Sequence, residues 1–174
     1  MGERGFTLVE LLVVLAVGSI LLAIAIPGYA FLVNSSRLAA VTNDMVTVLQ
    51  LARSEAVKRG VRITVCKTSN AGAAMPACDA TAGWHEGWLV FDDGGTRGVV
   101  DTNDRIFRVQ ERVHQTVSIT TGMTYSRFIS YLPNGSSQGS GGLSNGTFEI
   151  CTAGSRRDII INNVGRPRLA SGSC

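Results

Sequence analysis

The chain has 174 residues, a formal net charge of +3, and arginine as 14 of its 16 basic residues. A leader and a long N-terminal helix leave roughly 115 residues, which is room for one small domain and excludes a multidomain protein. The net charge is mild, but the planar donor fork of arginine suits contact with phosphate or carboxylate groups. A general coding bias toward arginine explains the same composition equally well.

The first thirty residues carry the strongest pattern. From Phe6 to Ile26 the only charged residue is Glu10, and these 21 residues are about what a helix needs to cross a bilayer. The run is apolar on every face, so it belongs in lipid or in a buried helical bundle. An ordinary signal peptide would show an A-x-A-like cleavage site after this run, which is absent. Cleavage between Gly5 and Phe6 would instead leave the apolar segment on the mature protein.

Glu10 is unusual because a carboxylate inside a membrane span costs ~2.5–3.5 kcal/mol on insertion scales. One interpretation is that Glu10 lies close enough to the helix end to reach the lipid headgroups. The other is that it pairs with a positive group. Cleavage after Gly5 would create such a group, because the new α-amine of Phe6 lies about one helical turn from Glu10.

The stretch Gly-Phe-Thr-Leu-Val-Glu-Leu-Leu at residues 5–12 resembles the class III signal of type IV pilins and type II secretion pseudopilins. The resemblance implies cleavage between Gly5 and Phe6 by a prepilin peptidase, followed by N-methylation of Phe6. It implies that Glu10 meets the N-terminal amine of a neighbouring subunit during filament assembly. It also implies a single-pass protein of the bacterial inner membrane, with a periplasmic C-terminal domain, that joins other major and minor pilins in a pilus or pseudopilus.

After Pro27 and Gly28 the pattern becomes that of an amphipathic helix. Apolar residues recur at spacings of three and four, which predicts one buried stripe. They are Leu38, Val41, Met45, Val48, Leu49, Ala52 and Ala56. Gly60 follows two basic residues and is a typical helix stop. We therefore expect one long helix from Phe6 to about Arg59, with its first half in the membrane or filament core and its second half against a sheet.

The rest of the chain predicts strands. Their expected ranges are 61–66, 88–91, 105–109, 117–120, 127–132, 147–151 and 158–162. Because no helices intervene, these strands should pair antiparallel. Residues 133–146, rich in glycine and serine, are expected to form a flexible loop, and residues 152–157 the turn of a hairpin.

Four cysteines follow the membrane segment, which predicts an exported, oxidised domain. Three pairings are possible, and we favour the two local ones, Cys66–Cys78 and Cys151–Cys174. A zinc site is the competing interpretation, but there is no C-x-x-C spacing and the two histidines lie far apart.

Residues 87–92, followed by a turn and by residues 105–108, resemble the central signature of the FimT/GspH branch of the pseudopilins. The resemblance implies an α+β fold in which a pilin-like N-terminal helix packs on a domain of two antiparallel sheets. The expected division is a leader at 1–5, a transmembrane and filament-core helix at 6–33, and a periplasmic domain at 34–174. That domain would combine the amphipathic helix 34–59 with the sheets of 61–174.

The C-terminal stretch is basic, with four arginines against one aspartate from Cys151 onward. Arg166 and Arg168 flank a proline that favours extended backbone, in which residues two apart point the same way. Both guanidinium groups could then face one ligand, and phosphate is the natural target for paired arginines. Arg156 and Arg157, in the expected hairpin turn, would extend the patch if they lie on the same side. A solvated tail without a partner is the plain alternative.

Gly165-Arg166-Pro167-Arg168 also matches the G-R-x-R motif of FimT-type minor pilins, which bind DNA for uptake in natural transformation. The resemblance implies contact with double-stranded DNA through Gly165, Arg166 and Arg168, largely independent of sequence and sensitive to salt. The alternative is a structural subunit, either a GspH-like pseudopilin of type II secretion or a FimU-like pilus-initiation subunit.

No other chemistry is expected. The acidic cluster from Asp92 to Asp104 lacks EF-hand spacing, and its Gly-Gly and Asn-Asp pairs are ordinary turn residues, so a structural turn is preferred over a calcium site. Neither a G-x-S-x-G nor a Walker-type motif is present. We expect no enzyme, cofactor or metal.

Overall fold

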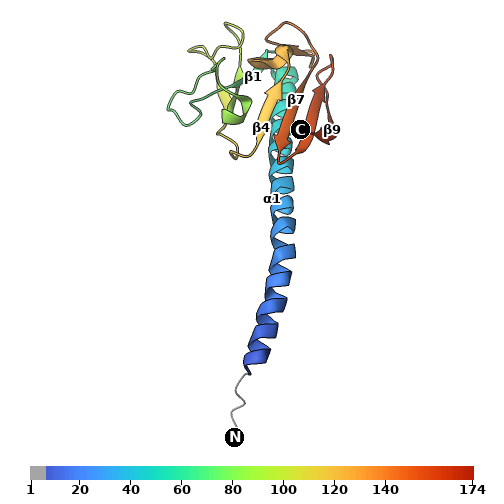
Figure 1. Ribbon diagram of the computed structural model, residues 1–174. Coiled ribbons are helices and arrows are strands. Elements are labelled where there is room, and N and C mark those ends of the chain that lie inside the picture. The colour runs from blue at the N-terminus through green and yellow to red at the C-terminus, as the bar shows by residue number, and fades with distance from the viewer. Residues whose placement is uncertain (1–6) are drawn as a thin grey trace. The chain divides into compact units, whose positions relative to one another are not determined.

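The computed structural model describes residues 7–174, so the predicted cleavage site between Gly5 and Phe6 lies outside the described residues. One long helix, α1 (Leu8–Arg59), is followed by nine strands (Figure 1). The helix continues past Pro27 and Gly28, as expected, and ends beside Gly60. The chain divides into two units, Met1–Ser36 and Arg37–Cys174, which we call the N-terminal segment and the compact unit.

The N-terminal segment begins with a capped helix end. The backbone N–H of Glu10 donates to Oγ1 of Thr7 at 3.2 Å, as in the S/T-x-x-E capping pattern. The large apolar side chains that follow are exposed. They include Leu8, Leu12, Leu15, Ile20, Leu22, Ile26 and Phe31. By length and composition, α1 qualifies as a candidate membrane span.

The compact unit contains two antiparallel sheets, as predicted. The first has five strands in the order β3-β2-β1-β5-β6. Their bounds are Ile106–Gln110 for β3, Trp88–Asp92 for β2, Ile63–Lys67 for β1, Phe128–Tyr131 for β5 and Ser137–Gly139 for β6. A register shift between Val90 and Phe91 interrupts the pairing of β2 with β3.

The second sheet has four strands in the order β4-β7-β8-β9, and the C-terminus lies at its edge (Figure 1). Their bounds are Ser118–Thr121 for β4, Gly146–Thr152 for β7, Ser155–Ile161 for β8 and Pro167–Ser173 for β9. Two short 3-10 helices, η1 (Trp84–Glu86) and η2 (Met123–Tyr125), precede β2 and β5.

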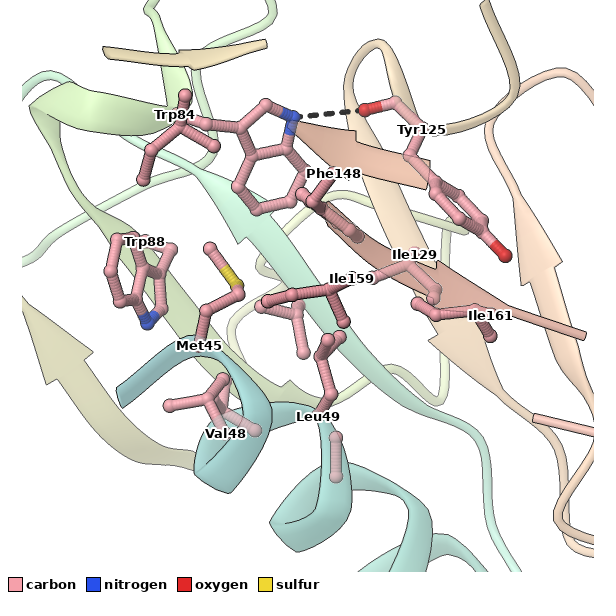
Figure 2. Close-up of a cluster of buried hydrophobic side chains, with 14 of the residues drawn as sticks. Met45, Val48, Leu49, Trp84, Trp88, Tyr125, Ile129, Phe148, Ile159 and Ile161 are labelled. Carbon is pink, nitrogen blue, oxygen red and sulfur yellow. Dashed lines mark hydrogen bonds between the residues drawn. The ribbon is translucent and has the colours of Figure 1, made fainter. Parts of the chain in front are cut away.

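The main core joins the second half of α1 to both sheets. The predicted stripe is buried, with Met45 and Leu49 fully covered, and Figure 2 shows these side chains among Ile129, Ile159 and Phe148. All seven residues of the stripe are buried. Nε1 of Trp84 donates to the carbonyl of Tyr125 at 2.9 Å, so this indole is buried without losing its hydrogen bond (Figure 2).

A smaller cluster occupies the other face of the five-stranded sheet. It contains Leu89, Phe91 and Phe128, with Cys66 and the half-buried Cys78 beside them. The structure pairs Cys66 with Cys78, which fastens the loop after β1 over this cluster, and pairs Cys151 with Cys174. These are the two pairings favoured from the sequence.

Three local expectations were wrong. Residues 133–146 are not one loop, because β6 lies within them and Ser137 is buried with its Oγ donating to the carbonyl of Ser144. The hairpin turn is shorter than expected, since Ala153 and Gly154 both have positive φ and close it in two residues. Residues 167–173 form strand β9 rather than a tail after the last strand.

Candidate nucleic-acid interface

The turn between β8 and β9 carries the G-R-x-R pattern. Asn162 organises it: its carbonyl accepts the N–H of Gly165 at 2.8 Å and its Oδ1 accepts the N–H of Arg166 at 2.9 Å. Asn162 N–H in turn donates to the carbonyl of Arg166 at 3.3 Å. The turn is thus hydrogen-bonded before β9 begins at Pro167.

Gly165 is required by this turn for two reasons. Its φ is +75°, a conformation that costs other residues energy. It is also buried, and a Cβ at this position would lie 2.3 Å from the carbonyl oxygen of Gly135 and 2.9 Å from Cε1 of Tyr131. The glycine of the pattern is therefore required by the backbone of the turn.

Arg166 is exposed and borders a hollow of about 630 Å³, which we call the helix hollow. Its lining residues come from the last turns of α1 and from the start of β9. They are Gln50, Arg53, Ser54, Val57, Lys58, Arg166 and Pro167. Arg166 thus lies beside two further cations, Arg53 and Lys58, that are distant from it in sequence.

Arg168 is also exposed but borders a second hollow of about 490 Å³, which we call the sheet hollow. It is lined by Asn145, Gly146, Thr147, residues 160–164 and Arg168. Arg166 and Arg168 therefore border different hollows, because Arg166 lies in the turn and Arg168 lies in strand β9. The two arginines border hollows built from opposite flanks of the same turn.

Arg156 and Arg157 lie within β8 and not in the hairpin turn, so their predicted location was wrong. Alternation along the strand places them on opposite faces of the sheet. Arg156 is on the face that carries Arg168, but it forms ion pairs with Asp158 at 3.0 Å and with Glu149 at 3.9 Å. Arg157 is exposed and donates to Oγ of Ser171 at 3.1 Å. Arg156 is therefore already neutralised by its neighbours.

The disulfide between Cys151 and Cys174 joins the end of β9 to β7, two strands away in the sheet. Backbone pairing of β9 with β8 along Pro167–Ser173 adds to this restraint. Arg168 is consequently carried by a strand that is fixed at both ends, which lowers the entropy lost when the side chain binds a ligand.

The acidic cluster is a structural turn in this fold. Asp93 is buried, and its carboxylate accepts hydrogen bonds from Nη2 of Arg62, Oγ1 of Thr64 and the N–H of Gly98, at 3.0, 2.5 and 2.9 Å. Asp101 and Asp104 accept backbone N–H groups within the same loop. Among the described residues no group of three or more His, Cys, Asp or Glu could hold a metal ion.

Sequence reasoning missed Arg53 and Lys58 as site residues. Their spacing with Gln50, Ser54 and Val57 does place all five on one helix face. Nothing in the sequence, however, indicated that the β8–β9 turn would lie against that face.

Comparison with known families agrees with this fold. The family model described as type II transport protein GspH matches residues 41–165, which is most of the chain. The chain belongs to the GspH family. The model for the prokaryotic N-terminal methylation motif matches residues 1–26, which include Gly5, Phe6 and Glu10. This member of the GspH family is therefore a minor pilin or pseudopilin, and its apolar N-terminus fits anchoring in the inner membrane.

Solved structures show the same fold. The type IV minor pilin FimU of Pseudomonas aeruginosa matches with 19% identity and a TM-score of 0.59, over 78% of this chain and 90% of that one. The minor pseudopilin EpsH of the Vibrio cholerae type 2 secretion system matches with 13% identity and a TM-score of 0.52, over 78% of this chain and 97% of that one. None of the curated proteins compared with the chain matches it. The GspH match ends at Gly165, directly before the two arginines.

Proposed function

We propose that this GspH-family protein is a FimT-type minor pilin of the type IV pilus machinery that binds double-stranded DNA for uptake in natural transformation. The observation that supports this proposal is the exposure of Arg166, in the hydrogen-bonded turn, and of Arg168, in the first residues of β9, each beside a hollow. The ion pairs found in the part of the chain that the structure describes involve Arg59, Arg62, Arg112 and Arg156. Arg166 and Arg168 are therefore available to an external anion.

The arrangement suits the phosphate backbone and not the base edges. Arginine donates to phosphate oxygens without reading sequence, so binding would be non-specific and would release counterions. Two to three arginines on one subunit predict weak binding that several subunits in a filament would reinforce. The exposed asparagines of the sheet hollow, which are Asn145, Asn162 and Asn163, can add neutral hydrogen bonds beside Arg168.

The test is DNA binding by the full chain in an uncharged detergent, measured by fluorescence anisotropy with a labelled duplex at several salt concentrations. The double variant Arg166→Ala/Arg168→Ala should lower affinity at low salt by roughly tenfold or more, and should reduce the slope of log K against log salt by roughly 2. The matched control is Arg105→Ala/Arg127→Ala, which removes the same charge from exposed arginines that border neither hollow and that form no ion pair among the described residues.

Near-UV circular dichroism must show that each variant keeps its fold. If the folded wild type does not bind duplex at low salt, the DNA proposal is wrong. The protein would then be a structural subunit, either a GspH-like pseudopilin of type II secretion or a FimU-like subunit that initiates pili.

Filament assembly would use the N-terminal segment. We propose cleavage between Gly5 and Phe6 by a prepilin peptidase, N-methylation of Phe6, and pairing of Glu10 with the N-terminal amine of a neighbouring subunit. The position of Glu10 in the first turn of α1, three residues after the capping residue Thr7, supports this role because it places the carboxylate at the N-terminal end of the helix.

Glu10→Gln tests the assembly role because it keeps the shape and removes the charge. We expect the variant to reach the inner membrane at the wild-type level and to be largely absent from sheared filaments, as measured by quantitative immunoblotting of the two fractions. Equal incorporation of variant and wild type would contradict the proposed pairing.

A further inference from the structure

The helix hollow gathers positive charge from two distant parts of the chain. Three of its lining residues are the cations Arg53, Lys58 and Arg166, and none of the described residues that line it is acidic. Lys58 and Arg166 are exposed, and Arg53 is half-buried. Like charges around one hollow repel one another, so an anion in the hollow would relieve that repulsion and be attracted by all three.

Arg53 is held in place by the segment that supports the turn. Its Nε donates to the carbonyl of Gly135 at 2.9 Å, and this is the carbonyl oxygen that a Cβ on Gly165 would strike. The side chain of Arg53 and the β8–β9 turn therefore both contact the carbonyl group of Gly135. With Nε engaged, the two terminal nitrogens of Arg53 remain for other partners, and little side-chain entropy is lost when they bind.

The placement of Arg168 indicates what kind of anion fits. The sheet hollow lies on the other flank of the turn, so one ligand that reaches both Arg166 and Arg168 must pass along the turn. A chain of regularly spaced phosphates does this, because each strand of duplex DNA carries one phosphate for every ~3.4 Å of helix axis. A single carboxylate would occupy only one hollow.

We propose that the helix hollow is a phosphate-binding site for the DNA backbone, formed by Arg53 and Lys58 of α1 together with Arg166. This inference rests on the proposed function and extends the DNA interface from the C-terminal motif onto the helix. Arg53 and Lys58 are then binding residues and not merely part of a solvated helix face. The volume of about 630 Å³ is in the range of ligand sites and leaves room for a sugar next to the phosphate.

Lys58→Glu is the first test, because Lys58 is exposed and its loss should not disturb the core. In the anisotropy assay with full chain and duplex, we expect affinity to fall by roughly tenfold at low salt and the salt slope to shrink by about 1. Arg127→Glu is the matched control, since it makes the same charge reversal beside the five-stranded sheet and should change affinity by less than about twofold.

Gln50→Lys is the second test, and it should raise the affinity for the duplex where Lys58→Glu should lower it. Gln50 is exposed at the rim of the hollow, and glutamine and lysine have similar helix propensity. A fourth cation should raise affinity by roughly threefold and increase the salt slope by about 1. A gain of binding cannot be produced by misfolding.

The outcomes separate this inference from the proposed function. If the duplex binds to wild type and is lost in Arg166→Ala/Arg168→Ala, while Lys58→Glu and Gln50→Lys both bind as wild type does, the helix hollow is not part of the interface. If wild type fails to bind duplex, both proposals are wrong. If poly-glutamate displaces the duplex as well as inorganic polyphosphate does at equal charge, the hollow takes acidic protein surfaces, and the assignment to phosphate is overturned.

Discussion

Helix α1 runs through both the N-terminal segment and the compact unit. The apolar side chains of the helix are mostly exposed in the first and mostly buried in the second. Residues such as Leu15 and Leu22 in the first are exposed, whereas Met45 and Leu49 in the second are fully buried. The difference lies in the pattern, because the first stretch is apolar on all sides and the second only along one stripe. The second finds its partner in its own sheets, while the first must find it in lipid or in other pilins.

Substitutions of leucine should expose this difference most strongly. Leu49→Ala removes a buried side chain from the core and should lower the free energy of unfolding by about 3 kcal/mol. Leu22→Ala, in the N-terminal segment, should leave it unchanged. Urea unfolding followed by tryptophan fluorescence measures the right part of the molecule, since Trp84 and Trp88 are both buried in the compact unit. Equal destabilisation by both variants would contradict the comparison.

Replacing a glycine by alanine should lower the unfolding free energy by less than Leu49→Ala does. The effect should again differ between the compact unit and the N-terminal segment. Gly165→Ala forces a positive φ and a close contact with Gly135, so we expect a loss of about 2 kcal/mol in unfolding free energy. Gly18→Ala meets nothing within 4 Å in a helix that favours alanine, and should cost the compact unit nothing. The same urea experiment applies. Wild-type stability of Gly165→Ala would show that the turn relaxes easily.

The smallest effect concerns alkaline pH. Burial raises the pKa of Tyr131 above its ordinary value of about 10. The unfolded chain therefore loses this proton near pH 10 while the folded protein keeps it, so stability falls as pH rises above 10. Tyr131→Phe should match wild type within about 0.5 kcal/mol at pH 7, because the hydroxyl has no hydrogen-bond partner among the described residues, and should lose less stability between pH 9 and 11.

Tyr29→Phe is the control for this prediction, since Tyr29 is exposed on the N-terminal segment. Its unfolding free energy should follow the wild-type curve at every pH. If Tyr131→Phe also follows that curve up to pH 11, the buried phenol is not a source of the alkaline loss.

The sequence was sufficient to predict a helix or strand wherever its apolar residues form a strong pattern. The stripe from Leu38 to Ala56 is predicted by its spacing and the strand at Trp88 by its short run of apolar residues, and the structure confirms both. Strands β6 and β9 were not predicted because they are rich in serine and glycine and their alternation of apolar residues is weak. Pairing with neighbouring strands holds both of them instead, and in β6 the buried Ser137 adds hydrogen bonds of its side chain.

The candidate site was predictable only in part for the same physical reason. Arg166 and Arg168 stand out because they lie two residues apart and follow a glycine. Arg53 and Lys58 join Arg166 only through tertiary packing, which brings the β8–β9 turn against the end of α1. The spacing of residues within the helix does not indicate such a contact. Arg53 and Lys58 could therefore not have been assigned to the candidate site without the fold.

Strand β9 also bears on how subunits avoid sticking to one another. It is an edge of its sheet, with one side unpaired, and an open edge can join another sheet and seed aggregation. Pro167 at its start lacks a backbone donor, and Arg168 brings a charge that would be costly to enclose. The arginine proposed to bind DNA thus also protects a crowded filament subunit from uncontrolled edge-to-edge association.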